Sequence, residues 1–300
     1  MAKSPNYTHF GWQGLEFDVP EDWNIAVVQG EFESGYIRLD DDAMVRVELK
    51  WEGRRNRLTL GKVVDNYLRM LEKKAKKHKL PFEYKRNLKF AKLEGHDFEC
   101  LSWESDFSAM SVAARCNDCG RVILARVLYT KGDGGRAAAK RLFSTLRDHP
   151  EGDMVKWEFF GFRFASPVGF TLDQSALKTG CIEMLFSDRK EEFEVSRLAL
   201  AQVLLKRQSL KAWFKDYYQK RLKTFKVEID KSEYRGHPAL AVSGRTSVKK
   251  SLLSGFARRR YIHCRVWHCE ETDKLFVLRI VSSKETDERF EKFCEQVACH

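Results

Sequence analysis

The clearest alternation of apolar and polar residues lies at residues 36–51. Isoleucine, leucine, valine and tryptophan occupy every second position there, and three aspartates at residues 40–42 interrupt the alternation. Such spacing is typical of a half-buried strand, and an aspartate cluster favours a turn. Residues 181–200 show the same arrangement around a polar cluster at residues 187–189. The pattern therefore predicts one β-hairpin in each half of the chain.

A second pattern follows each predicted hairpin. Apolar residues recur at intervals of three and four within residues 60–71 and again within residues 210–222. That period predicts an amphipathic helix in each half. Further strands follow, and shorter helices are predicted near residues 136–147 and 286–298. The two halves thus predict the same elements in the same order.

The two halves also match in residue type. Four matched pairs occur in the same order: residues 14–23 with 161–170, 60–71 with 210–222, 93–103 with 234–244, and 116–128 with 269–281. Collinear matches indicate a duplicated module. We place the copies at residues 1–150 and 151–300, because Pro150 and Gly152 break regular structure at the junction.

These elements define the predicted fold class. We expect an α+β protein of two tandem homologous modules, each a mainly antiparallel β-sheet covered by two α-helices. A length of 300 residues suits two domains, since single cores rarely grow beyond about 250–300 residues.

The order of motifs in each copy resembles the Mog1/PsbP-like family. A first strand leads to a proline three residues before an aromatic, as in Pro167 and Phe170. A hairpin, a long helix, a strand opening on Gly-His-Pro-Ala at residues 236–239, a strand at residues 274–278 and a final helix follow. The family includes a Ran-binding factor, extrinsic photosystem subunits and bacterial lipoproteins. The resemblance implies a non-catalytic binding module, but it places no binding residue, and a signal peptide with a lipobox cysteine is missing here.

Composition points to a soluble protein. The first ten residues contain no apolar signal-peptide core. The longest apolar run, near residues 198–205, is far shorter than the ~20 residues that span a bilayer. We therefore expect a cytoplasmic protein without a membrane partner, whose eight cysteines are mostly free thiols.

Cys116 and Cys119 form the one Cys-x-x-Cys motif in the sequence. A zinc site needs four ligands, and no second such pair exists. Other residues of suitable type lie in the second copy: His263, Cys264, His268 and Cys269. The matched turn of that copy has Thr272 in place of Cys119, so we favour a hairpin turn over a metal site. A redox pair would open a helix, whereas this pair precedes a strand-like run. Cys116 and Cys119 remain weak metal candidates, and no cofactor is predicted.

No catalytic signature is present in the sequence. His96 and His237 occupy matched positions after a glycine, which a turn explains as well as a site does. The glycine-rich segment 131–136 lacks phosphate-loop spacing, and the aspartates at 40–42 lack EF-hand spacing. We predict no catalytic residue and expect a protein that is not an enzyme.

Positive charge is concentrated in the second copy. The net charge is +11, and residues 206–260 hold sixteen Lys/Arg against four Asp/Glu. Basic and aromatic residues interleave there, as in a nucleic-acid or acidic-partner surface. The candidate binding residues are Lys249, Lys250, Phe256, Arg258, Arg259, Arg260 and Tyr261. A solvated basic face is the alternative, and it is the favoured interpretation of a second basic run at residues 73–79, because cations are stabilised at a helix C-terminus.

Together these patterns predict a non-enzymatic binding or scaffold protein. Its partner, a protein or another acidic molecule, would bind in a cleft between the modules or on the basic face of the second. The first alternative is a nucleic-acid-binding protein that uses residues 206–260. A further alternative is an enzyme with a convergent site in the cleft between the modules.

Overall fold

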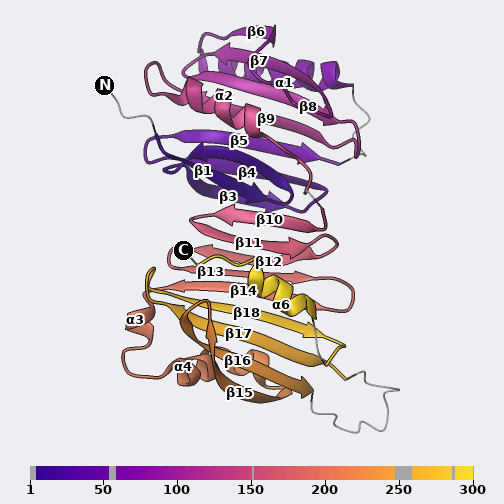
Figure 1. Ribbon diagram of the computed structural model, residues 1–300. Helices are drawn as coiled ribbons and strands as arrows, with labels where there is room; N and C mark the ends of the chain where they lie inside the picture. The colour runs from indigo at the N-terminus through magenta and orange to yellow at the C-terminus, as the bar shows by residue number, and fades with distance from the viewer. Residues whose placement is uncertain (1–4, 54–58, 151, 247–258, 286–287, 300) are drawn as a thin grey trace. The chain divides into compact units, whose positions relative to one another are not determined.

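The computed structural model describes residues 5–53, 59–150, 152–246, 259–285 and 288–299 (Figure 1). The chain separates into two compact units, residues 1–162 and 163–300, and each is described by itself. The sequence boundary at residue 150 remains a prediction about the repeated modules. The division between compact units falls instead within β11 (Phe162–Pro167).

The predicted fold class, two sheets each covered by two helices, is wrong. Of the described residues, 51% lie in strands and 20% in helices, so the protein is mostly β. Four strands were not predicted. Two of them, β3 (Asn24–Gly30) and β12 (Thr171–Lys178), lie at sheet edges and contain no fully buried residue. The other two, β1 (Tyr7–Trp12) and β10 (Met154–Phe159), lie in segments for which no strand was proposed. The single helix predicted at 210–222 is instead two short helices, α4 (Leu210–Tyr217) and α5 (Gln219–Leu222).

The first unit is built on a seven-stranded antiparallel sheet with the order β3-β4-β5-β9-β8-β7-β6. Its remaining strands are β4 (Ser34–Asp40), β5 (Val45–Glu52), β6 (Glu83–Leu88), β7 (His96–Glu104), β8 (Ser108–Cys116) and β9 (Val122–Tyr129). The hairpin predicted at 36–51 is β4–β5, with Ile37 opposite Leu49. At the far edge the pairing of β6 with β7 shifts register between Lys85 and Leu88.

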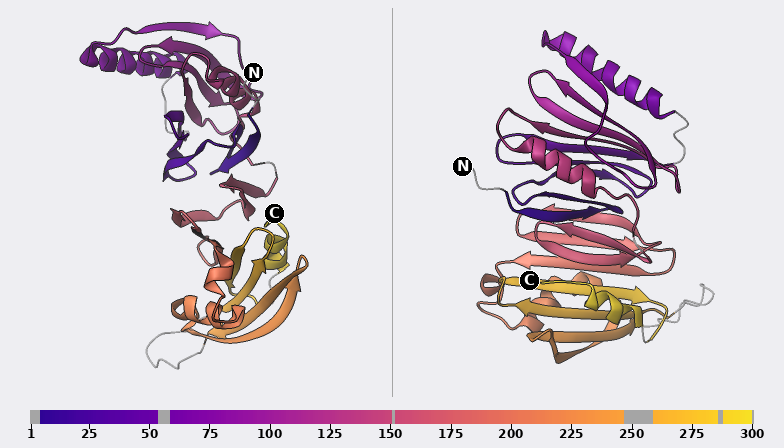
Figure 2. Two further views of the ribbon diagram at one scale, coloured as in Figure 1. Left: turned by 90° about the vertical axis from the view of Figure 1, so that its left-hand side faces the viewer. Right: turned by 45° about the horizontal axis from the view of Figure 1, so that its top comes forward.

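Two helices lie on opposite faces of this sheet. The longer helix, α1 (Leu60–His78), begins at the cap residue Thr59 and ends at Lys79, whose left-handed φ is 57°. Its buried face packs on β7, β8 and β9 through one set of alternating side chains. The second helix, α2 (Gly135–Thr145), packs on β8 and β9 from the other side, and Figure 2 shows strands between the two helices.

A smaller sheet adjoins α2. Strands β1 (Tyr7–Trp12) and β2 (Leu15–Pro20) form an antiparallel hairpin, and β10 (Met154–Phe159) pairs with β1. Two backbone hydrogen bonds, of 3.0 and 2.9 Å, join Glu16 of β2 to Arg147. These bonds fix the segment that follows α2.

The second unit is also built on a seven-stranded antiparallel sheet, with the order β12-β13-β14-β18-β17-β16-β15. Its other strands are β13 (Cys181–Ser187), β14 (Glu192–Ala199), β15 (Phe225–Tyr234), β16 (His237–Thr246), β17 (Tyr261–Cys269) and β18 (Lys274–Ser282). The predicted hairpin at 181–200 is β13–β14. Besides α4 and α5, the helices are α3 (Ala201–Leu204) and α6 (Glu288–Glu295).

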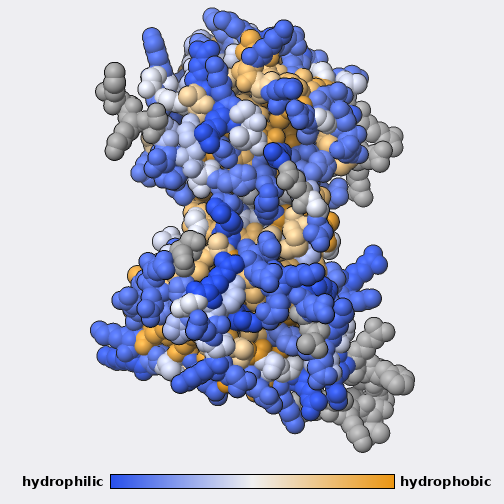
Figure 3. All heavy atoms as spheres, in the orientation of Figure 1, coloured by the Kyte–Doolittle hydropathy of each residue, from blue (hydrophilic) through white to orange (hydrophobic). Residues whose placement is uncertain are grey.

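The two large sheets have the same connectivity. Three strands in succession, a helical segment, four more strands and a final helix occur in each unit, and corresponding strands occupy corresponding places in the sheet order. The duplication that the sequence repeat indicates remains a prediction. The surface seen in Figure 3 is largely hydrophilic, with apolar side chains gathered over β7 and β8.

Candidate ligand-binding cleft in the first unit

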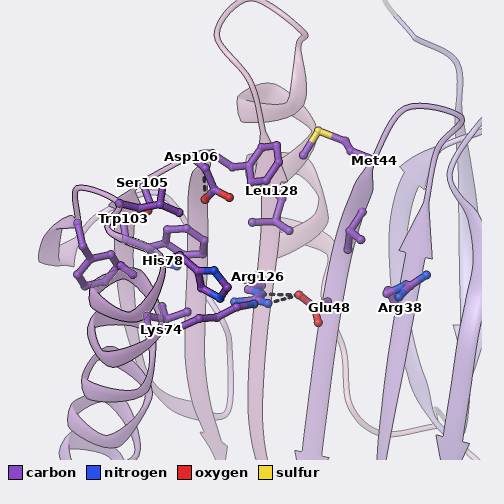
Figure 4. Close-up of a pocket in the computed structure, with 16 residues that line it drawn as sticks. Arg38, Met44, Glu48, Lys74, His78, Trp103, Ser105, Asp106, Arg126 and Leu128 are labelled. Atoms are coloured by element: carbon purple, nitrogen blue, oxygen red, sulfur yellow. Dashed lines mark hydrogen bonds and ion pairs between the residues drawn. The ribbon is translucent and has the colours of Figure 1, made fainter.

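A cleft of about 680 Å³ opens between the C-terminal half of α1 and the sheet of the first unit (Figure 4). Its lining comes from α1, from strands β4, β5, β7 and β9, and from the loops at the strand ends. The residues that line it are Arg38, Met44, Val45, Glu48, Leu71, Lys74, Ala75, His78, Leu80, Phe82, Trp103, Ser105, Asp106, Phe107, Arg126 and Leu128.

The walls of the cleft are apolar. Leu71 lies on the helix and Leu128 on the sheet, and both belong to the core between them. The Trp103 ring is held in place because its Nε1 donates a hydrogen bond of 3.1 Å to the Tyr67 hydroxyl. Phe107, by contrast, is 38% exposed, so a large apolar side chain stands at the rim of the cleft. A volume of this size and such walls are typical of ligand-binding sites.

The floor of the cleft carries a row of charges. Arg38, Glu48 and Arg126 are direct cross-strand neighbours on β4, β5 and β9. The Arg126 Nε donates to Glu48 Oε2 at 2.7 Å, and the Tyr36 hydroxyl donates to Glu48 Oε1 at 2.5 Å. Burial opposes ionisation of Glu48, but Arg126 and Tyr36 outweigh it, so the pKa of this carboxyl lies below its ordinary value. Glu48 is therefore a carboxylate at neutral pH.

Cations outnumber anions around this floor. Lys74 from α1 adds to the two arginines, whereas Glu48 and Asp106 are the acidic residues of the lining. Arg38 Nη2 contacts Asp40 at 2.8 Å, outside the cleft lining. Arg38 Nε is buried and has no hydrogen-bond partner among the described residues. A buried donor of this kind is costly unless an acceptor meets it, so the floor is suited to an anionic group.

The basic patch predicted in the second unit is only partly described. Lys249, Lys250, Phe256 and Arg258 lie outside the described residues, so that prediction stays a prediction. Of the others, Arg259 is exposed and Arg260 contacts Glu192 at 3.2 Å. Tyr261 begins β17 opposite Ser282. The predicted cleft between the modules likewise remains a prediction.

The cleft of the first unit was missed at the sequence level. Its lining comes from separate segments, and none of them carries a local motif. The one available signal was the basic run at 73–79, which was interpreted as a solvated helix end. The structure places Lys74 and His78 from this part of α1 in the cleft lining.

The predicted turn at the Cys-x-x-Cys motif is confirmed. Residues 117–120 connect β8 to β9, and all eight cysteines of the chain are thiols. Ligand atoms of Cys116 and Cys119 lie within 4.8 Å of one another and of Asp148 and His149, from the same unit. A second cluster joins His237, Cys269 and Cys299. Within the described residues, His263, Cys264 and His268 belong to neither cluster.

The two repeated histidines each follow a turn glycine, as predicted. Gly95 has a φ of 71° and Gly236 a φ of 78°, the left-handed region that favours glycine. His96 also contacts Asp148, with 3.0 Å between Nε2 and Oδ1. The Asp148 carboxylate raises the pKa of His96 above its ordinary value, against the opposing effect of burial.

Comparisons with known proteins leave the family open. No family model matches the chain, and no curated protein matches its sequence. The solved structure of the Saccharomyces cerevisiae Ran-binding protein Mog1p is similar over 46% of this chain and 80% of its own length, with 14% sequence identity and a TM-score of 0.30. A likeness at this level does not assign the chain to the Mog1/PsbP-like family. None of the helices formed by the described residues is long and apolar enough to cross a membrane.

Proposed function

We propose that this chain is a non-enzymatic binding protein whose first unit receives an acidic segment of a partner protein in the cleft beside α1. One observation carries the proposal: a 680 Å³ cleft combines apolar walls with a floor and rim on which cations outnumber anions. Such a site matches a peptide that carries a large apolar side chain next to carboxylates.

The apolar part of the segment would pack between the helix and the sheet. Phe107 and Leu80 are each more than one-third exposed, so a partner side chain would remove their surface from water. Burial of that surface stabilises a complex by roughly 25 cal/mol per Å² before the cost of association. The α1 side of the cleft is helical and the floor is a central part of the sheet, so the site is preformed.

The carboxylates of the segment would meet Arg38, Arg126 and Lys74. Arg38 offers a buried donor without a partner among the described residues. A basic ligand would face repulsion from the same groups, so the cleft selects by charge as well as by shape.

The chemistry of the floor supports binding rather than turnover. Glu48 already accepts hydrogen bonds from Tyr36 and Arg126, and its pKa is lowered. A general base that works near neutral pH instead needs a raised carboxyl pKa and an unengaged oxygen. The charged row therefore serves to hold a ligand and not to move a proton.

A titration of the whole protein with a panel of short peptides tests this proposal. We expect glutamate-rich peptides that contain phenylalanine or leucine to shift the NMR signals of cleft residues, and lysine-rich peptides of equal length to leave them unchanged. Lys74→Ala should weaken binding about two- to fivefold, the size of an exposed ion pair. The matched control is Lys77→Ala, because Lys77 is on the same helix but does not line the cleft.

Two results would contradict the proposal. One is the absence of any shift at the cleft with every acidic peptide of the panel. The other is binding that Lys74→Ala and Lys77→Ala weaken equally, since that pattern indicates a diffuse charge effect. A single-stranded oligonucleotide serves as a further probe: strong binding that falls steeply with salt would favour the nucleic-acid alternative.

A further inference from the structure

The turn between β8 and β9 presents two thiols to one side. Gly120 N–H donates to the Cys116 carbonyl at 3.1 Å, and Gly120 has a φ of 73°, which closes the turn. Backbone N–H groups also face the two sulfurs. Asp118 N lies 3.3 Å from Cys116 Sγ, and Arg121 N lies 3.4 Å from Cys119 Sγ. These two contacts hold both sulfurs in place at the turn.

A histidine and a carboxylate reach the same place from the segment after α2. The backbone pairing of Glu16 with Arg147 holds the residue next to Asp148, and Arg121 Nη1 donates to the Asp148 carbonyl at 2.9 Å. This segment is therefore fixed against the cysteine turn. One ligand atom each from Cys116, Cys119, Asp148 and His149 lies within 4.8 Å of all the others.

The separations fit a four-coordinate zinc ion. Cys116 Sγ lies 3.7 Å from His149 Nε2. Tetrahedral zinc, with Zn–S of about 2.3 Å and Zn–N of about 2.0 Å, places sulfur and nitrogen about 3.5 Å apart. Two thiolates and an imidazole are ligands that zinc prefers, whereas magnesium and calcium prefer oxygen ligands.

Asp148 supplies a second, independent indication of a cation. Its Oδ1 lies 2.8 Å from His149 Nδ1 and 3.0 Å from His96 Nε2. The contact with His96 orients this carboxylate, as an outer-shell partner does for a metal ligand. The other oxygen, Oδ2, is buried and has no hydrogen-bond partner among the described residues, on a residue only 2% exposed. A bound cation would satisfy that oxygen.

From these contacts we propose that the first unit binds one zinc ion through Cys116, Cys119, His149 and Asp148. The ion would join the β8–β9 turn to the segment that follows α2, so its role is structural. A cavity of about 590 Å³, lined in part by Cys116, Asp148 and His149, gives the metal an access route.

The second unit provides an internal reference. Its cluster contains His237, Cys269 and Cys299, with 3.6 Å between His237 Nε2 and Cys299 Sγ. Thr272 stands there at the position that the sequence repeat matches to Cys119. The second unit thus accommodates threonine at the place where the first unit has a ligand, and Cys119→Thr is a conservative way to remove one thiolate.

Metal analysis of the reduced, full-length protein purified without chelator tests the proposal. We expect one equivalent of zinc that is lost in Cys119→Thr and in His149→Ala. Cobalt in place of zinc should give the visible bands of a tetrahedral ion and a sulfur-to-cobalt charge-transfer band that Cys119→Thr weakens. Cys181→Ser is the matched control, because Cys181 is a partly exposed thiol outside both clusters.

Chelation of the wild-type protein gives a measurement that does not depend on whether the variants fold. We expect EDTA to remove the zinc and to lower the melting temperature of the wild-type protein, with no effect of EDTA on the melting of Cys119→Thr. The proposal is overturned if folded, reduced wild-type protein holds no zinc and gives no cobalt spectrum. It is overturned equally if Cys119→Thr retains a full equivalent of zinc.

Discussion

The two large sheets contain the same cross-strand ion pair in two different surroundings. Glu48 and Arg126 are cross-strand neighbours in the first unit, and Glu194 and Arg279 are cross-strand neighbours at the corresponding place in the second. The side chains of the first pair are 23% and 19% exposed, whereas those of the second are 2% and 7% exposed. The same charges therefore form the floor of a cleft in one unit and part of the core in the other.

The helical segment above the pair accounts for this difference. In the second unit α4 ends at Tyr217, and the hydroxyl of Tyr218, which is fully buried, donates to Glu194 at 2.9 Å. Arg221 of α5 also reaches Glu194, at 3.3 Å. In the first unit α1 continues unbroken to His78. The broken helix fills the space above its ion pair, and the continuous helix leaves that space open.

A further difference lies in the row of residues across the sheet. Arg38 stands beside Glu48 on the neighbouring strand, and Leu185 stands beside Glu194 at the corresponding place. The first unit therefore has an additional cation in the row. The comparison shows how one framework can hold either a closed core or an open charged site through changes in one helix and one strand.

The largest expected effect is on the free energy of unfolding, and it should differ between the two ion pairs. Arg279→Ala leaves the Glu194 carboxylate buried without its main partner, and we expect a loss of about 3–5 kcal/mol in the free energy of unfolding. Arg126→Ala leaves Glu48 near water, with an expected loss of about 1 kcal/mol. Hydrogen exchange at β14 and β18, and at β5 and β9, measures each unit separately.

A double substitution controls for a general loss of packing. If charge burial is the cause, adding Glu194→Gln to Arg279→Ala should recover part of the lost stability. Equal losses for Arg279→Ala and Arg126→Ala would show that the two pairs have similar surroundings, against the structure.

An intermediate effect is expected when one residue of the first unit is replaced by its counterpart in the second. Arg38→Leu introduces the residue found at position 185 and removes the additional cation of the row. We expect binding of an acidic peptide to weaken about tenfold, which corresponds to roughly 1.4 kcal/mol. The Arg38–Asp40 ion pair is partly exposed, so stability should change by less than about 1 kcal/mol. Isothermal titration calorimetry and urea unfolding measure the two quantities, and unchanged affinity would exclude Arg38 from recognition.

The smallest expected effect is a pH dependence that belongs to Glu48. Its pKa in the folded state is below the ordinary value of 4.5, so it binds fewer protons folded than unfolded at mildly acidic pH. Its contribution to stability is complete above that ordinary pKa and is lost as the pH falls through the folded pKa. Glu48→Gln should therefore flatten the stability profile below about pH 4.5 by roughly 1 kcal/mol or less, because the carboxylate is partly exposed. Urea unfolding at a series of pH values gives the profile, and a variant that keeps the wild-type acid dependence would assign it to other carboxylates.

The sequence predicted those elements whose signals are local. The hairpins at 36–51 and 181–200 combine strict alternation with polar turns, and both form where expected. The edge strands β3 and β12 were missed because strands with no fully buried residue carry little apolar pattern. The break at Tyr218 was missed because the apolar period continues through it, while the hydroxyl bonds to Ser196 and Glu194 that accompany it are tertiary contacts.

The candidate sites were harder to predict because tertiary structure assembles them. The two cysteines were visible as half of a zinc motif, but His149 follows them after a helix, at a distance that no fixed spacing rule specifies. The further ligand candidates named from the sequence, His263, Cys264, His268 and Cys269, lie outside this cluster. The cleft gave even less signal, since Arg38, Glu48 and Arg126 become neighbours only through strand pairing.

The irregular pairing of β6 has a consequence for self-association. Between Lys85 and Leu88 the strand slips out of register, and Asn87 there has a φ of 55°. A strand from another molecule would meet misaligned amides and charged side chains at this edge, which disfavours its addition there. The β15 edge pairs without a slip over all ten residues, so only its charges discourage an added strand. At high protein concentration or acidic pH, we therefore expect self-association through β15 of the second unit before β6 of the first.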